Sequence, residues 1–199
     1  MKDKILEISA ELFLNLGFKS VTMDEIANKL GVSKKTIYKY FKNKTSLVDC
    51  VTKHLFRKIC FGIDLIHQQQ KNPIIELFEI KQFVMKNLKN EKSSPQYQLQ
   101  KYYPKIFTWL KKEQFNIMHN SILENLKTGI DNGYYRENTD IDFTARIYFH
   151  GLNGIRDADM FPYENYPMKS LMNSYLEYHI RGIATEKGLL ELKKQLTEK

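Results

Sequence analysis

The amino-acid sequence predicts an all-α protein, with an N-terminal three-helix helix–turn–helix domain followed by a larger helical domain. Apolar residues recur at three- and four-residue spacing along most of the 199 residues, as amphipathic helices require. No segment shows the sustained alternation of apolar and polar residues that is typical of a half-buried strand. Glycine and proline separate the periodic segments, which predicts about nine or ten helices. We expect the two domains to be 1–46 and 47–199.

The first two helices are marked by their end signals. Residues 3–16 carry an apolar stripe at helical spacing, and Gly17 ends that helix. Thr22 begins the next helix, and Glu25 follows three positions later, which is the spacing of a capping box.

Residues 26–48 hold six lysines and no carboxylate. Gly31 interrupts the helical pattern, and Ser33 is a good N-cap for a new helix. That helix is expected to bury Ile37 and Phe41, four positions apart, and to leave its lysines facing outward. Two short helices joined by a turn that contains glycine, with a basic outer face on the second, fit the major groove of DNA. The segment therefore predicts a sequence-specific DNA-binding element.

The rest of the chain continues as helices. Asn43 can cap a long helix over about 44–70, which ends in the polar tract before Pro73. The following helical pattern stops in the loop-like stretch 90–98. The remaining expected helices are 74–90, 104–130, 142–157, 168–183 and 186–196.

Charge and cysteine content indicate the class of partner and the compartment. The formal net charge is +8, and residues 1–46 contain nine lysines against five acids, which favours a nucleic-acid partner. Cys50 and Cys60 are ten residues apart in one expected helix, so they lie on different sides and can neither bridge each other nor share a metal. The chain has no apolar run long enough for a membrane span and no secretory signal, so we expect a cytoplasmic protein without membrane contact.

The first 47 residues resemble the DNA-binding domain of the TetR family of bacterial transcriptional regulators. The resemblance implies a regulator, most often a repressor, that binds a double-stranded DNA operator. This chain departs from the family pattern at Lys35, where glycine is usual, and at Thr45, where an acid is common. The residues that carry the resemblance are Ile5, Ala10, Leu12, Phe13, Gly17, Thr22, Ile26, Ala27, Gly31, Val32, Ser33, Thr36, Ile37, Tyr38, Tyr40, Phe41, Lys44 and Leu47.

The family pattern and side-chain chemistry together predict the DNA contacts. Lys34 and Lys35 are expected to reach guanine O6 and N7 at the start of the recognition helix. Tyr38, Thr22 and Lys44 are expected to donate to phosphates. Tyr40 has two open readings, a phosphate contact or packing under the first helix. The full set of expected DNA-binding residues is Thr22, Ser33, Lys34, Lys35, Thr36, Tyr38, Lys39, Tyr40 and Lys44.

The resemblance also implies that residues 47–199 bind an effector and form a homodimer through a four-helix bundle. Helices 142–157 and 168–183 are the expected dimer helices, although their glycines could equally serve packing within one chain. The expected interface residues are Gly151, Gly154, Leu171, Tyr175 and His179. A small apolar or aromatic effector is expected to contact Trp109, Phe115, Met118, Phe149, His150 and Asn153, any of which could instead belong to the core.

Two other classes of function are weighed against a ligand-responsive repressor. Catalysis is disfavoured because the sequence contains no cofactor motif, no metal-ligand spacing and no nucleophile motif. Asp157 and Asp159 are two residues apart and do not share a helical face with each other. We therefore expect no catalytic residues, no metal and no cofactor. The second alternative is a DNA-binding adaptor of the same fold that a protein partner controls, without a small-molecule pocket.

Overall fold

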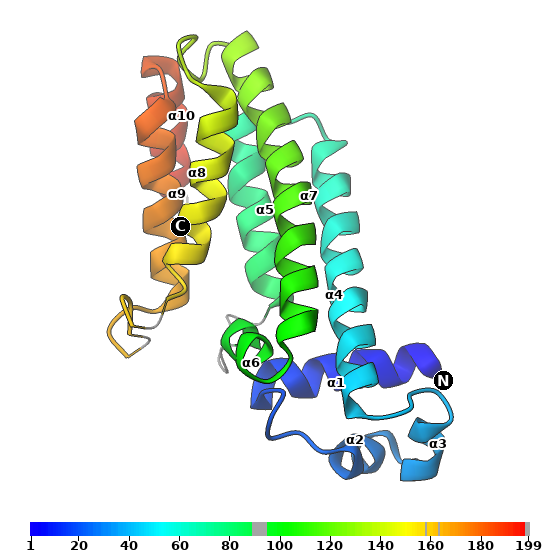
Figure 1. Cartoon of the computed structure of the whole chain (residues 1–199). Coiled ribbons are helices and arrows are strands. Elements are labelled where there is room, and N and C mark those ends of the chain that lie inside the picture. The colour runs from blue at the N-terminus through cyan, green and yellow to red at the C-terminus, as the bar shows by residue number, and fades with distance from the viewer. Residues whose placement is uncertain (89–94, 158, 163, 198–199) are drawn as a thin grey trace. The chain divides into compact units, whose positions relative to one another are not determined.

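A computed structural model describes residues 1–88, 95–157, 159–162 and 164–197 (Figure 1). This described part is helical, and an isolated bridge between Tyr135 and Ala184 is its one β-type pairing. None of its helices is both long and apolar enough to cross a membrane. The helices are α1 (Lys2–Leu16), α2 (Met23–Leu30), α3 (Lys34–Tyr38), α4 (Lys44–His67), α5 (Pro73–Asn87), α6 (Pro95–Tyr102), α7 (Pro104–Asp131), α8 (Ile141–Gly154), α9 (Met168–Ile183) and α10 (Glu186–Thr197).

The chain forms two compact units. The first contains Met1–Phe61 and Lys86–Glu113, and the second contains Gly62–Met85 and Gln114–Lys199. The first unit therefore includes residues 86–113 as well as the helix–turn–helix. The expected division of function at residues 46 and 47 stays a prediction.

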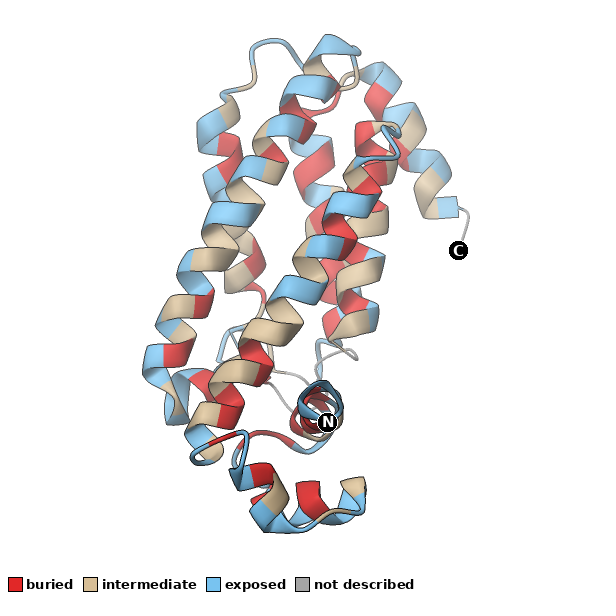
Figure 2. Cartoon of the chain, turned by 90° about the vertical axis from the view of Figure 1, so that its right-hand side faces the viewer, coloured by how far each residue is buried: buried red, intermediate tan, exposed pale blue. Residues whose placement is uncertain are grey.

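The core of the first unit joins α1–α4 to α6 and the start of α7. Ile5, Ile26 and Ile37 are fully buried, and α1 packs on α2, which packs on α3. Leu99 of α6 and Leu110 of α7 are buried in the same cluster. Figure 2 shows the buried residues of these helices in red.

Helix α6 was not predicted, since the sequence pattern indicated a loop over 90–98. Residues 90–94 of that stretch lie outside the described residues. Pro95 begins α6, a position where its missing N–H costs nothing. The side chain of Leu99 is buried and packs α6 against the core of the first unit. An eight-residue helix of mostly polar composition is stabilised by tertiary packing more than by its own propensity. The sequence pattern therefore carries little signal for it.

The second unit packs α5, α8, α9 and α10 with the C-terminal part of α7. Its core includes Leu126, Leu176 and Ile180, all almost fully buried. The ring of Tyr135 lies where a side chain at Gly129 would have to be, so glycine at that position lets the ring enter the core. Both α8 and α10 pack on α9.

A polar network is buried inside the second unit. Nδ1 of His67, the last residue of α4, lies 3.0 Å from Oε2 of Glu76 on α5. Nδ2 of Asn125 donates to Oε1 of Glu76 at 2.7 Å, and the Tyr135 hydroxyl donates to Oδ1 of Asn125 at 3.1 Å. Each side chain of this network therefore has a hydrogen-bond partner, as a low-dielectric interior favours.

Candidate nucleic-acid interface

The helix–turn–helix is held by local caps at both helices. Thr22 and Glu25 form the predicted capping box: the Glu25 N–H donates to Oγ1 of Thr22 at 3.1 Å, and Oε2 of Glu25 accepts from the Thr22 N–H at 2.6 Å. Gly31 has φ 66°, the left-handed conformation that ends α2 without the penalty a side chain would bring. Oγ of Ser33 accepts the Thr36 N–H at 3.1 Å and caps α3. The turn is therefore specified by contacts three residues apart.

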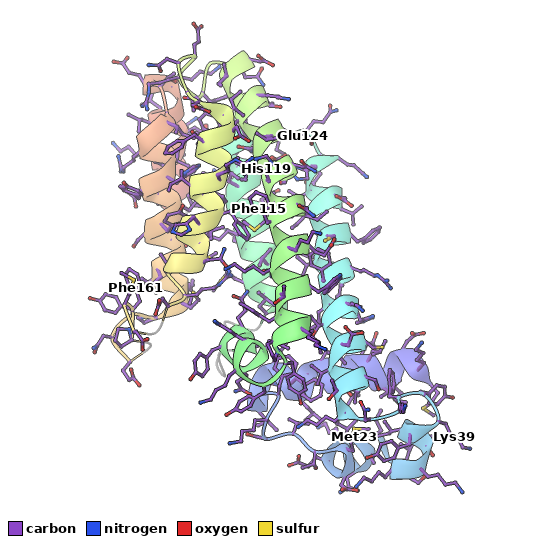
Figure 3. The ribbon with its side chains drawn as sticks, viewed as in Figure 1. Met23, Lys39, Phe115, His119, Glu124 and Phe161 are labelled. Atoms are coloured by element: carbon purple, nitrogen blue, oxygen red, sulfur yellow. The ribbon has the colours of Figure 1, made fainter. Side chains whose placement is uncertain are left out.

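Helix α3 buries its predicted apolar side. Ile37 is fully buried, and so is Phe41, although α3 ends at Tyr38 and Phe41 lies just beyond it. Lys34 and Lys35 of α3 and its C-cap Lys39 are all exposed. Figure 3 labels Met23 and Lys39, at the two ends of this helix–turn–helix.

Tyr38 and Tyr40 are equally available to a partner. They are 43% and 44% exposed, so Tyr40 is no more covered than Tyr38. This exposure favours the phosphate-contact reading of Tyr40 over packing under the first helix. The two hydroxyls stand on rigid rings and can donate to phosphate oxygens.

Lys34 has a protein partner. Its Nζ lies 2.8 Å from Oδ2 of Asp24, and this hydrogen bond raises the pKa of Lys34. Both side chains are well exposed, so the pair is weak and water or another acceptor can replace Asp24. The sequence pattern did not indicate this pairing, since the two residues lie on different helices.

Lys44 joins the start of α4 to the loop before α2. Its Nζ donates to the carbonyl oxygen of Lys19 at 3.2 Å, and partial burial lowers its pKa. Asn43 caps α4 as predicted, because its Oδ1 accepts the Ser46 N–H at 2.8 Å. Lys44 is therefore an anchor within the unit as well as an expected phosphate contact.

These local features agree with a family of known proteins. Residues 5–51 match the model of bacterial regulatory proteins of the tetR family. Residues 5–51 therefore form a DNA-binding domain of the TetR family. The predicted resemblance and the all-α fold are thereby confirmed.

Two curated relatives of this TetR-family chain match it over short segments. The HTH-type transcriptional regulator YhgD of Bacillus subtilis is 40% identical over 58 residues, 29% of this chain and 30% of YhgD. IcaR of Staphylococcus aureus, a negative transcriptional regulator of the biofilm operon icaADBC, is 30% identical over 76 residues. That segment is 38% of this chain and 40% of IcaR. The chain thus matches less than half the length of either relative.

A solved structure shares the fold along nearly the whole TetR-family chain. A transcriptional regulator from Saccharomonospora viridis, in complex with choline, superimposes with a TM-score of 0.70. The match covers 93% of this chain and 98% of that one at 16% sequence identity. At this identity the likeness shows the fold alone.

The expected effector residues of the TetR-family chain fall in both units. Phe115 of α7 and Phe149 of α8 meet edge to face, with ring centroids 5.2 Å apart, and Met118 packs against the core of the same second unit. Trp109 belongs to the first unit, where it packs edge to face on Phe56 at 5.7 Å. The structure therefore brings Phe115 and Phe149 together and places Trp109 in another core.

The two polar effector candidates have different surroundings. His150 is exposed on α8. Asn153 donates from Nδ2 to the carbonyl oxygen of Phe149 at 2.8 Å, so its side chain turns back onto its own helix. The roles of His150 and Asn153 toward an effector stay predictions.

Charged groups that the sequence pattern did not indicate surround the Phe115 ring. Oδ1 of Asp142 accepts from Nε2 of His119 at 2.9 Å, and Oδ2 accepts from Nε of Arg146 at 2.7 Å. The bond from Arg146, followed by that from His119, lowers the pKa of Asp142. The Arg146 guanidinium also lies 5.7 Å from the centre of the Phe115 ring. Figure 3 labels Phe115 and His119 on α7.

Most of the expected dimer residues lie inside one protomer. Leu171 and His179 are buried, and the Tyr175 hydroxyl donates to the carbonyl oxygens of Ile147 and Tyr148 at 3.1 and 3.0 Å. That hydroxyl would lie 2.2 Å from a Cβ built on Gly151. Gly154 has no atom within 4 Å of such a Cβ, so it is the expected interface glycine that leaves room for a partner.

Among the described residues, no group of three or more His, Cys, Asp or Glu side chains could hold a metal ion. In the same described residues, Cys50 and Cys60 form no disulfide. The site therefore consists of hydrogen-bond donors, cations and aromatic rings, which are the groups that bind a polyanionic duplex.

Proposed function

We propose that this chain is a sequence-specific DNA-binding transcriptional regulator of the TetR family, acting in the cytoplasm as a repressor of a pseudo-palindromic operator. The observation that carries the proposal is the capped helix α3, which buries Ile37 and leaves Lys34, Lys35 and the C-cap Lys39 exposed. A helix of this kind inserts into the major groove and reads base edges from its N-terminal end. The relative IcaR, a negative regulator, supports repression.

A single helix–turn–helix contacts few base pairs, so the regulator should bind DNA as a two-fold homodimer. We place the dimer surface on the outer faces of α8 and α9. Phe143, Ile147 and Tyr178 are 62%, 45% and 76% exposed there, and large apolar side chains at this exposure are typical of an interface. Gly154 belongs to the same proposal, since its surroundings are open.

A small apolar or aromatic effector should release the operator. The aromatic pair Phe115 and Phe149, with Met118 nearby in sequence on α7, is the apolar group that supports this part of the proposal. The structural neighbour that holds choline shows that this fold accommodates a small organic molecule in another protein. An effector that binds the two conformational states unequally by about 1–3 kcal/mol would release DNA about 5- to 150-fold.

The proposal is tested first by DNA selection. Purified wild-type protein is mixed with genomic fragments at about 0.15 M salt, where electrostatic binding alone is weak, and captured fragments are sequenced. A shared pseudo-palindrome with half-sites about 34–36 Å apart, or multiples of that distance, supports a dimeric regulator. Fragments without a shared motif would overturn sequence-specific binding. Lys35→Ala should relax the preference within that motif, and Lys127→Ala, on the second unit, should leave it unchanged.

The effector is tested by thermal shift. A panel of apolar and aromatic compounds is screened for a concentration-dependent rise in Tm, because a ligand that binds only the folded state stabilises it. Each hit should weaken binding to the selected operator, and Phe149→Ala should abolish both effects. If no compound raises Tm and a cellular protein releases the DNA, the adaptor alternative holds.

A further inference from the structure

The positive charge of this protein is concentrated in one compact unit and extends well beyond the helix–turn–helix. Residues 1–61 contain twelve Lys and Arg side chains against six carboxylates, and residues 86–113 contain seven against two. The formal charge of the whole chain is only +8, so the second unit is net acidic. Residues 86–113 therefore contribute about as much excess charge as the segment that carries α1–α4. The DNA contacts of the proposed function all lie in residues 22–44 and include none of the lysines of residues 86–113.

Two stretches of the first unit contain cations and no acid. Residues 12–23 contain Lys19 alone among charged side chains, and residues 95–112 contain four lysines, Lys101, Lys105, Lys111 and Lys112. A surface built from these stretches has no carboxylate of its own to neutralise it. Such a surface attracts a polyanion.

The structure brings the two stretches together at the loop before α2. Oε1 of Gln98 on α6 accepts the Lys19 N–H at 3.1 Å, and Nζ of Lys44 donates to the Lys19 carbonyl oxygen at 3.2 Å. The backbone of Lys19 is thus held from both sides, by α6 and by the start of α4. Its side chain remains exposed.

Two tyrosine rings lie beside the lysine side chains. Nζ of Lys19 lies 5.4 Å from the centre of the Tyr102 ring, and Nζ of Lys101 lies 5.7 Å from the same ring. Nζ of Lys101 also lies 5.6 Å from the centre of the Tyr97 ring and 3.5 Å from its hydroxyl. Tyr97 and Tyr102 are themselves exposed. The result is a row of cations and phenol hydroxyls at the surface of the first unit.

We propose that this row, Lys19, Tyr97, Lys101 and Tyr102, is a second DNA-binding surface that contacts the phosphate backbone outside the base pairs read by α3. The inference rests on the proposed function. It adds a sequence-independent contact that lengthens the bound segment of duplex. Lys44, an expected phosphate contact, touches the Lys19 backbone, so the row continues directly from the expected interface. Lysine ammonium and tyrosine hydroxyl groups are the donors that proteins use toward phosphates.

The test measures salt dependence on two lengths of DNA. The shortest duplex that keeps sequence discrimination is compared with the same duplex lengthened by about 10 base pairs, one helical turn, on each side. Each phosphate that a lysine neutralises steepens the slope of log K against log salt by about 0.9. In the proposed dimer each protomer adds two lysine contacts, so four added contacts should make the long duplex steeper by about 3.6, a roughly 150-fold change in relative affinity between 50 and 200 mM salt.

Charge variants assign that difference to the row. Lys19→Gln with Lys101→Gln should abolish the extra slope of the long duplex and leave binding to the short one unchanged. Lys19→Arg with Lys101→Arg should retain the extra slope. Lys127→Gln with Lys169→Gln removes two exposed cations from the second unit and serves as the matched control, which should behave as wild type.

The outcomes separate the two proposals. If the wild type binds both duplexes with equal slopes, or if the glutamine variant keeps the extra slope, the row is a solvated surface and the second DNA contact is wrong. In either case the proposed function stands, because the short operator is still bound specifically. If the wild type selects no DNA sequence at all, the proposed function fails and this inference fails with it.

Discussion

Nζ of Lys34, at the start of α3, lies 2.8 Å from Oδ2 of Asp24 on α2, so the free protein keeps a carboxylate beside a lysine that is expected to read bases. Both side chains are exposed, and an exposed pair of this kind is easily exchanged. Binding DNA would replace Asp24 by a base or phosphate acceptor. We therefore expect Asp24 to compete with DNA for Lys34.

Asp24→Asn should strengthen DNA binding, because it frees Lys34 and removes a negative charge close to the duplex. The affinity should rise several-fold, and the salt slope should steepen by about one unit. Equilibrium binding at a series of salt concentrations measures both. Lys34→Ala should weaken binding in either background. Weaker binding by Asp24→Asn would show instead that the carboxylate positions Lys34 for contact.

Thr22 has a structural role that can be separated from its expected phosphate contact. Its hydroxyl accepts the Glu25 N–H and donates to Oε2 of Glu25. Thr22→Ala removes the cap and should lower the free energy of unfolding by about 1 kcal/mol, whereas Thr22→Ser should keep it. Urea unfolding gives the stability, and DNA affinity is measured where all variants are fully folded. An alanine variant that binds DNA as well as wild type would restrict Thr22 to capping.

His67 should make stability depend on pH on the alkaline side. The hydrogen bond with Glu76 raises the pKa of His67 above its unfolded value of about 6.5. The folded state therefore holds the proton more tightly, and this contribution is complete below pH 6.5 and is lost as pH rises through the folded pKa. Urea unfolding between about pH 6 and 8 should show this decline in the wild type. His67→Gln should flatten it; an unchanged decline would assign it to other groups.

His179 should make the folded protein less stable as the pH falls below neutral. Burial lowers its pKa to about 4, and its Nε2 has no hydrogen-bond partner within the described structure. Between pH 4 and 6.5 the unfolded chain binds the proton more readily, so stability falls as pH falls, by on the order of 3 kcal/mol. His179→Phe keeps an aromatic ring beside Tyr148. In urea unfolding, this variant should lose the fall in stability between pH 6.5 and 4. Retention of the full acid dependence in that variant would contradict the assignment.

Gly151 and Gly154 should respond differently to the same substitution. A Cβ at Gly151 would meet the Tyr175 hydroxyl at 2.2 Å and displace it from two carbonyl oxygens, so Gly151→Ala should destabilise the protomer by about 1–3 kcal/mol. Gly154→Ala meets nothing within 4 Å and should leave the protomer fold intact. If Gly154 lies at the dimer surface, its substitution should change the dimer dissociation constant in analytical ultracentrifugation. An unchanged constant would place the interface elsewhere.

The elements that the sequence predicted well depend on contacts between residues close along the chain. The Thr22–Glu25 box, the left-handed Gly31, and the Ser33 and Asn43 caps each involve neighbours within about four positions. Hydrophobic periodicity likewise predicted the long helices, since it records which side of each helix faces a core. The exposed lysines of α3 and the resemblance to the TetR family could therefore be inferred before any tertiary structure was known.

Only the tertiary structure decided which distant segments share a core. Leu99 and Leu110 join residues 86–113 to the helix–turn–helix, Trp109 packs on Phe56 in that unit, and Lys34 finds Asp24 on another helix. Periodicity shows that a side chain is buried and says nothing of its partner, because the partner is selected by three-dimensional packing. The sequence by itself therefore determined the helix–turn–helix, its caps and its basic side. Packing between distant segments determined the extent of the basic unit and the interior positions of Tyr175 and His179.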